Sequence, residues 1–213
     1  ALCLAGCSKN FLDRNALDAI PNDEFWKSEA QLKLAANGCY SSLKGKNVVD
    51  MENLGDNTIY PPMSDYLNIS TGNYDFTVAT VNNEWVNQFK GIRRCNHFLE
   101  NYKKAQGIQD AKMKQFAGEV RFIRAFLYSY LSFFYGDVPL ITNTINITDD
   151  LVYGSRTPRA QVVDFILQQL DSAALELPTK YSSDDLGRIT KGAALGWKSR
   201  VALFYGKYDV AEA

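Results

Sequence analysis

The chain is poor in the residues that most enzyme sites require. It contains one histidine, His97, in 213 residues, so a Ser-His-Asp triad would have to use that side chain. The patterns G-x-S-x-G, H-E-x-x-H, C-x-x-C and G-x-G-x-x-G and the Walker loop are all absent from the sequence. The sequence therefore predicts a protein that is not an enzyme and that uses no cofactor and no metal ion.

A strong charge of one sign and long apolar runs are also lacking. The chain has 23 basic and 24 acidic residues, a net charge of -1, and no block of lysine or arginine. Nucleic acid needs a basic surface, so it is not an expected partner. No run of 18 apolar residues occurs, so no segment is expected to cross a bilayer as a helix. With 46% hydrophobic residues, the chain is instead long enough to bury a substantial core.

The first seven residues are small and apolar, and they give way to the polar Ser8-Lys9-Asn10. This change is typical of the end of a signal peptide at its cleavage site. Leu4-Ala5-Gly6-Cys7 matches the bacterial lipobox, in which the cysteine is lipidated and the signal is cut just before it. We therefore expect residues 1–6 to be a signal-peptide remnant, Cys7 to carry acyl chains that bind a membrane, and residues 7–21 to be a tether. The alternative is an apolar N-terminal strand or a chance match.

Two further cysteines, Cys39 and Cys95, lie on expected helices. An oxidising compartment would allow a disulfide between them. Isolated cysteines on helical patterns more often behave as small buried hydrophobic residues, and we favour buried thiols.

Apolar residues recur at helical spacing over most of the chain. The expected helices cover residues 22–44, 83–105, 110–135, 157–178 and 190–204. Thr157-Pro158 predicts a capped helix start, and Thr190 can cap the last helix. Gly206, Tyr208 and Ala211 have the spacing of a tetratricopeptide-type helix pair. The predicted fold class is all-α, with tetratricopeptide-like helical hairpins and long inserted loops.

One of these loops, residues 47–81, is rich in amides, carboxylates and tyrosines. Tyrosine faces stack on the C–H faces of a sugar ring, while Asp and Asn hydrogen-bond to its hydroxyl groups. Long loops on a rigid scaffold are also where binding residues concentrate. The alternative is a coil whose tyrosines pack against the helices. The candidate ligand-binding residues are Asp56, Asn57, Tyr60, Tyr66, Asn68 and Tyr74, with Asp65, Asn73 and Asp75 beside them.

Motifs along nearly the whole chain resemble one known family. They are Leu4-Ala5-Gly6-Cys7, Phe11-Leu12-Asp13, Phe25-Trp26, the stretches 85–96, 119–126 and 135–140, Thr157-Pro158-Arg159 and the stretch 187–194. In this order the motifs resemble the N-terminal half of SusD/RagB-type outer-membrane lipoproteins of Bacteroidetes. The resemblance implies that residues 22–213 form a SusD-like N-terminal helical domain that lacks its C-terminal part.

The resemblance also implies a function. It implies a lipid-anchored, surface-exposed protein of the cell outer membrane that binds oligosaccharides, without altering them, for a SusC-like TonB-dependent transporter. There are three alternatives. The protein could bind peptides, or it could be a tetratricopeptide-type scaffold for a protein partner. It could also be a hydrolase, for which catalytic signals are missing.

Residue by residue, little of the family can be transferred to this sequence. Cys7 matches the lipidated cysteine, and Glu119, Arg121 and Arg124 match a motif whose role looks structural. Arginines on a buried helix usually pair with carboxylates or carbonyl groups. Family members on the cell surface often carry acidic residues just after the lipidated cysteine, whereas the first acidic residue here is Asp13.

Overall fold

The computed structural model describes residues 22–56, 58 and 64–212. The predictions for the signal remnant, for Cys7 and the tether, and for Asn57 and Tyr60 therefore lie outside the described residues.

The described part of the chain is built from helices. The α-helices are α1 (Asn22–Phe25), α2 (Glu29–Tyr40), α3 (Asn47–Met51), α4 (Asp65–Ser70), α5 (Ala79–Asn101), α6 (Asp110–Tyr135), α7 (Arg159–Glu176), α8 (Lys191–Phe204) and α9 (Tyr208–Glu212). Short 3-10 helices cover Glu52–Leu54, Tyr102–Lys104, Asp150–Tyr153 and Ser183–Asp185. Within residues 22–56 and 64–212, the β-type pairing is an isolated bridge between Val138 and Thr157. The all-α prediction is confirmed.

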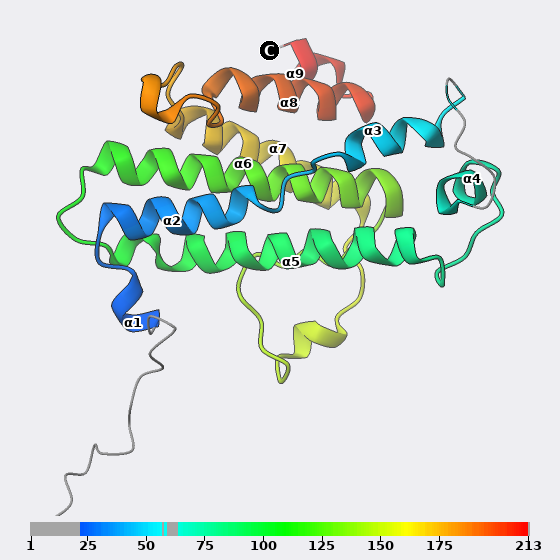
Figure 1. Ribbon diagram of the computed structural model, residues 1–213, viewed down its shortest axis with the longest axis horizontal. Helices are drawn as coiled ribbons and strands as arrows, with labels where there is room; N and C mark the ends of the chain where they lie inside the picture. Colours follow the sequence, from blue (N-terminus) through cyan, green and yellow to red (C-terminus); the bar gives the residue numbers. More distant parts are fainter. Residues whose placement is uncertain (1–21, 57, 59–63, 213) are drawn as a thin grey trace, which may run out of the picture.

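Helix α6 is the centre of the bundle. It packs against α2, α5 and α7, and α8 packs on the far side of α7. The successive long helices α5, α6, α7 and α8 alternate in direction, which gives a series of antiparallel hairpins (Figure 1). Phe116, Ile123 and Leu127 are buried on α6, as its apolar character around most of its circumference predicts. This central helix fixes the positions of the others.

The first expected helix is broken in two at Ser28. The hydroxyl of Ser28 accepts a hydrogen bond from the Gln31 N–H at 3.3 Å, and the Gln31 side chain accepts one from the Ser28 N–H at 3.0 Å. This reciprocal capping box starts α2 at Glu29 and separates it from α1. The sequence pattern predicted one continuous helix here because apolar spacing alone does not reveal a local cap.

The second helix begins four residues earlier than expected, at Ala79. Its N-cap residue, Val78, has no side chain that can cap. The carboxylate of Asp65, on α4, instead accepts hydrogen bonds from the N–H of Thr80 at 3.1 Å and from its hydroxyl at 2.7 Å. A distant residue therefore supplies the cap, and it ties α4 to the start of α5.

One of the two predicted threonine caps is wrong. Thr157 is not the N-cap of α7, which begins at Arg159 after Pro158, and its hydroxyl accepts the N–H of Leu140 at 3.3 Å instead. The carboxylate of Asp137 accepts the N–H of Arg159 at 2.8 Å and serves the first turn instead. The prediction for Thr190 is confirmed, since its hydroxyl accepts the Ala193 N–H at 3.3 Å.

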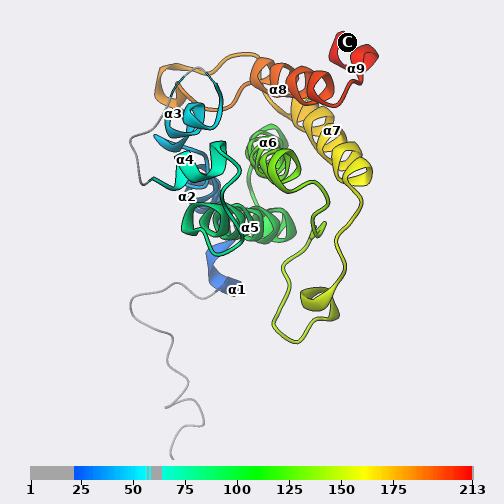
Figure 2. The same cartoon turned by 90° about the vertical axis from the view of Figure 1, so that its right-hand side faces the viewer.

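The two predicted loops differ in structure. Residues 47–81 include α3 and α4, which gather at one end of the bundle. The segment between α6 and α7 leaves the bundle and extends away from it (Figure 2). Cys39 and Cys95 are both buried and unbridged, as favoured from the sequence.

Candidate ligand-binding site

A cavity of about 380 Å³ opens where α4 meets the first turns of α5 and the end of α6. It contains two of the tyrosines that the sequence singles out, Tyr66 and Tyr74. We call it the loop cavity. The residues that line it are Met51, Leu54, Tyr66, Ile69, Tyr74, Thr80, Val81, Asn83, Glu84, Asn87, Phe134 and Tyr135.

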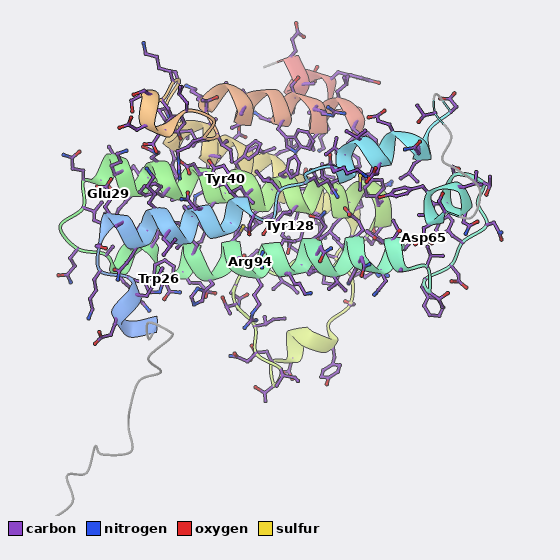
Figure 3. The ribbon with its side chains drawn as sticks, viewed as in Figure 1. Trp26, Glu29, Tyr40, Asp65, Arg94 and Tyr128 are labelled. Carbon is purple, nitrogen blue, oxygen red and sulfur yellow. The ribbon has the colours of Figure 1, made fainter. Side chains whose placement is uncertain are left out.

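Hydrogen bonds hold the walls of the loop cavity in place. The Ser64 hydroxyl accepts the N–H of Leu67 at 3.2 Å and caps α4, which carries Tyr66. The pair formed by Asp65 and Thr80 fixes this helix to α5. From the opposite wall, the hydroxyl of Tyr135 donates to the Val81 carbonyl at 2.6 Å. The cavity is therefore a built feature of three helices, and Figure 3 shows Asp65 at this end of the molecule.

The aromatic side chains of the loop cavity differ in exposure. Tyr66 is half-buried, while Tyr74 and Phe134 are 51% and 46% exposed. The ring of Trp85 meets that of Tyr135 edge-on, with ring centroids 5.1 Å apart. Flat, partly exposed rings beside a rigid wall offer a stacking surface for an apolar ligand face.

Polar groups line the same cavity from α5. Asn83 and its neighbour Glu84 lie one helical turn before Asn87, and the two amides are exposed. The Glu84 carboxylate accepts hydrogen bonds from the Gln88 amide at 2.7 Å and from the ammonium group of Lys44. Lys44 is only 5% exposed in its side chain and neutralises Glu84. Amides that both donate and accept are suited to neutral hydroxyl groups of a ligand.

The phenol of Tyr135 stays protonated over the whole physiological range, and its one hydrogen is donated to the Val81 carbonyl. Burial raises the pKa of Tyr135 to about 12, and the nearby Glu84 carboxylate acts in the same direction. The loop cavity thus combines a neutral phenol, two neutral amides and a paired carboxylate. It carries no unpaired charge of its own.

The structure separates the other sequence-predicted residues from the loop cavity. Asp56 is exposed and Asn68 is half-buried, and neither lines it. The carboxylate of Asp75 accepts the N–H and hydroxyl of Thr77 at 2.8 and 2.6 Å, which lowers its pKa. Asp75 therefore serves the local backbone, whereas Asp65 is used to cap α5.

Sequence reasoning missed the lining residues that lie on regular helices, which include Thr80, Asn83, Asn87 and Phe134. The predicted site comprises polar and tyrosine side chains of the loop, whereas α5 and α6 close the cavity in the structure. The spacing of Asn83 and Asn87, four residues apart beside a loop, is the signal that could have found them, because such residues share one helix face.

The motif at Glu119, Arg121 and Arg124 lies in the bundle, away from the loop cavity. Arg121 pairs with Glu176 of α7 at 2.9 Å, and Arg188 pairs with Glu119 at 2.5 Å. Arg124 is only 5% exposed. Its guanidinium donates to the side chains of Asn96 and Gln169 and to the Thr142 carbonyl, at 2.8, 2.5 and 3.2 Å. These contacts join α6 to α5, α7 and the connections around them.

Two classes of feature are absent from the described residues. Three or more His, Cys, Asp or Glu side chains do not gather anywhere in residues 22–56 and 64–212 as a metal ion would require. None of the helices described here has the length and apolar character needed to cross a bilayer.

Comparison with known proteins identifies similar chains. A SusD-like family model, described as starch-binding and associating with the outer membrane, matches residues 10–203. The SusD-like protein P25 of Formosa agariphila is 26% identical over 201 residues, which cover 87% of this chain and 38% of that protein. The chain thus spans about two fifths of the length of such relatives.

Solved structures agree on the fold. A SusD-like protein from Bacteroides fragilis superposes with a TM-score of 0.83 at 29% identity, over 93% of this chain and 39% of that one. A laminarin-binding SusD-like protein superposes with a TM-score of 0.79 at 22% identity, over 87% and 42% of the two chains.

Proposed function

Because the chain belongs to the SusD-like family of starch-binding proteins that associate with the outer membrane, we propose that it binds oligosaccharides in the loop cavity. The observation that carries this proposal is that Tyr66, Tyr74 and the exposed amides of Asn83 and Asn87 all line one cavity. The laminarin-binding relative of the same fold supports a carbohydrate rather than a peptide ligand.

The cavity would bind a sugar by its two kinds of surface. The rings of Tyr66, Tyr74 and Phe134 would cover the apolar C–H face of a pyranose. The amides of Asn83 and Asn87 would hydrogen-bond to the hydroxyl groups around its edge, and the phenol oxygen of Tyr135, whose hydrogen is donated to Val81, would accept from one of them. Because Glu84 is paired with Lys44, the cavity favours a neutral sugar over a charged one.

We propose capture without catalysis. Inverting and retaining glycoside hydrolases use two carboxylates that flank the scissile bond. Glu84 is the single carboxylate among the residues that line the loop cavity, and its pairing with Lys44 and Gln88 suits a structural role. A captured sugar would then pass to a SusC-like TonB-dependent transporter, the partner expected for this family.

The remaining part of the proposal concerns location. The family description supports association with the outer membrane. We propose that acyl chains on Cys7 provide the anchor and that the domain faces outward. Several acyl chains are needed for stable anchoring, since each buried CH₂ contributes only about 0.8 kcal/mol.

The test is a binding titration with product analysis. The full chain, titrated calorimetrically with malto-oligosaccharides and with laminarin fragments, should bind at least one series and return it unchanged by chromatography. Cleavage that follows the pure protein through purification would overturn the non-catalytic proposal. Binding of neither series, together with capture of a protein partner, would favour the scaffold alternative.

A further inference from the structure

The two carboxylate oxygens of Glu84 have different surroundings. Oε1 accepts hydrogen bonds from the ammonium group of Lys44 and, at 2.7 Å, from the amide of Gln88. Oε2 accepts none from the described residues, and it is not one of the side-chain oxygens that are buried without a partner. Oε2 is therefore open to solvent. Since Glu84 lines the loop cavity, this oxygen is available to a ligand there.

The positive charge that balances Glu84 lies away from the cavity. The side chain of Lys44 is 5% exposed, against 14% for that of Glu84, and Lys44 does not line the cavity. Its ammonium nitrogen lies over the ring of Tyr130, 4.5 Å from the ring centroid. A ligand in the loop cavity therefore meets the free carboxylate oxygen of Glu84 before it meets the cation.

The charge of Glu84 acts on another wall residue of the same cavity. Burial raises the pKa of Tyr135, and the Glu84 carboxylate raises it further. The hydrogen of the Tyr135 phenol is donated to the Val81 carbonyl, so its oxygen can only accept a further hydrogen bond. Glu84 and Tyr135 thus present acceptor oxygens, and such a wall requires a ligand that brings donors.

We propose that Glu84 selects the class of sugar that the loop cavity binds, on the premise of the proposed function that sugars bind there. Oε2 accepts a hydrogen bond from a hydroxyl group of a neutral sugar. A sugar that carries a carboxylate or a sulfate group brings further acceptor oxygens with a charge of the same sign. Glu84 therefore excludes acidic oligosaccharides, because an unpaired like charge opposes their binding.

Selection by Glu84 differs from a preference that arises only because the cavity has no net charge. A cavity without net charge would keep the same preference if Lys44 and Glu84 were both replaced by neutral side chains. Selection by the free oxygen would be lost in that case, because the acceptor itself is removed. The two explanations for a preference for neutral sugars therefore predict different results for one variant.

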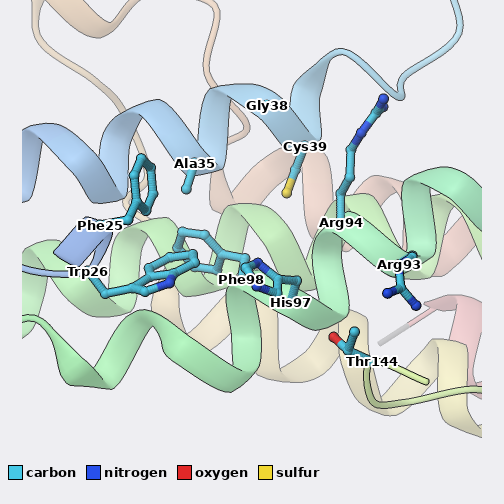
Figure 4. Close-up of a pocket in the computed structure, with 10 residues that line it drawn as sticks. All are labelled: Phe25, Trp26, Ala35, Gly38, Cys39, Arg93, Arg94, His97, Phe98 and Thr144. Atoms are coloured by element: carbon cyan, nitrogen blue, oxygen red, sulfur yellow. The ribbon is translucent and has the colours of Figure 1, made fainter. Parts of the chain in front are cut away.

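A second cavity, of about 470 Å³, has the opposite charge chemistry. It lies between α1, α2 and the C-terminal half of α5, and Figure 4 shows Arg93 and Arg94 in its lining together with aromatic rings. None of the described residues that line it is an aspartate or a glutamate. An acidic oligosaccharide bound to these arginines would not report on Glu84. The selection must therefore be measured as competition for the loop cavity.

Calorimetry with two matched ligands tests the selection. The first ligand is a malto-oligosaccharide or laminarin fragment that the unsubstituted protein binds. The second is the same oligosaccharide after oxidation of its C6 carbons to carboxylates, so the two ligands differ only in that group. In competition, the unsubstituted protein should prefer the neutral form by at least about tenfold. Equal affinity for the two forms would overturn the proposal.

Glu84→Gln replaces the free acceptor by a donor. Because Lys44 and Gln88 both donate to Oε1, the new amide should turn its oxygen toward them and place its NH₂ group where Oε2 was. Affinity for the neutral ligand should fall by about tenfold, as expected for the loss of a hydrogen bond to a charged group, and the preference over the oxidised form should shrink. Glu52→Gln, at an exposed carboxylate outside the cavity lining, should change neither.

The double variant Lys44→Met with Glu84→Gln separates ligand contact from stability. It removes both charges of the pair together, a change that is often neutral for stability, so it should fold. It should nevertheless keep the weakened affinity and the reduced preference of Glu84→Gln. An unchanged preference in this folded variant would overturn the role of Glu84 and leave sugar binding intact. If the unsubstituted protein binds no neutral oligosaccharide, the proposed function fails, and the role of Glu84 fails with it.

Discussion

The carboxylate of Glu119 and the guanidinium of Arg188 form a buried ion pair with an N–O distance of 2.5 Å. Glu119 is completely buried on α6, and Arg188 reaches it from the connection between α7 and α8. The Tyr181 hydroxyl donates to the same carboxylate at 3.0 Å, and Gln115 donates at 3.1 Å. Arg188 also donates to Asn37 of α2 at 2.9 Å. One carboxylate thus joins three parts of the fold.

Removing that carboxylate should destabilise the protein strongly. Glu119→Gln leaves the Arg188 guanidinium without its counter-charge, and breaking a buried pair on one side costs about 3–5 kcal/mol. Urea unfolding followed by circular dichroism measures the change. The control is Glu176→Gln, which breaks the half-exposed pair with Arg121 and should cost at most about 1 kcal/mol. Equal losses for the two variants would contradict the central role of Glu119.

The close approach of α5, α6 and the turn that follows α2 at Gly91 predicts a second loss of stability. A Cβ at Gly91 would lie 2.7 Å from Leu127 Cδ1 and 2.8 Å from Ser42 Cβ. Gly91→Ala should therefore lower the free energy of unfolding by about 1–3 kcal/mol through overpacking. Gly196→Ala, at an open position of α8, should instead raise it by up to about 1 kcal/mol. A neutral Gly91→Ala would show that the helices are less closely packed than described.

Buried tyrosines predict how stability changes at high pH. Burial raises the pKa of Tyr135 to about 12 and also raises the pKa values of Tyr40, Tyr128 and Tyr181. In the unfolded chain, tyrosine side chains have a pKa of about 10. Between pH 10 and 12 the folded state therefore holds more protons, and stability must fall as pH rises. Burial lowers the pKa of Arg124 to about 10, which acts in the opposite direction and offsets only part of the loss.

The urea midpoint measured at pH 8, 10 and 11.5 tests this sign. It should change little up to pH 10 and then decrease, and absorbance at 295 nm should show tyrosinate appearing together with unfolding. If the urea midpoint instead increases when the pH is raised above 10, the effect of Arg124 on stability outweighs that of the tyrosines.

The lipid anchor predicts a change of cellular fraction. Cys7→Ala in the precursor should move the protein from the membrane fraction to the soluble fraction, because the acyl chains are the proposed attachment. Cys3→Ala serves as the control and should stay membrane-bound. A Cys7→Ala protein that remains in the membrane fraction would refute the anchor.

The sequence predicts the helices well where the signal is local. Residues 110–135 form α6 with the expected bounds, because apolar spacing and the following Gly136 define both its face and its end. The start of α5 could not be predicted, since its cap comes from Asp65, which stands 15 positions earlier. The Thr157 cap fails for the same kind of reason, because the hydroxyl of Thr157 accepts the N–H of Leu140, which stands 17 positions earlier.

The candidate site could be predicted only in part. Tyr66 and Tyr74 stand out because tyrosine is unusual in a polar loop, and both line the loop cavity. Asn83 and Phe134 look like ordinary helical residues in the sequence, and only the folding of α5 and α6 against α4 brings them to the same cavity. Asp56 and Asn68 have the expected chemistry but lie outside the cavity, and no local sequence feature distinguishes these two polar loop residues from ones that line it.

The most direct test of the account is the affinity of the loop cavity for an oligosaccharide, measured by calorimetry on tyrosine variants. With a ligand that the unsubstituted protein binds, Tyr66→Ala and Tyr74→Ala should each weaken binding by about tenfold or more, equivalent to about 1.4 kcal/mol. Tyr153→Ala, at a tyrosine that is 86% exposed on the segment between α6 and α7, should leave the affinity unchanged. Unchanged affinity in both cavity variants would contradict the account and place the sugar elsewhere.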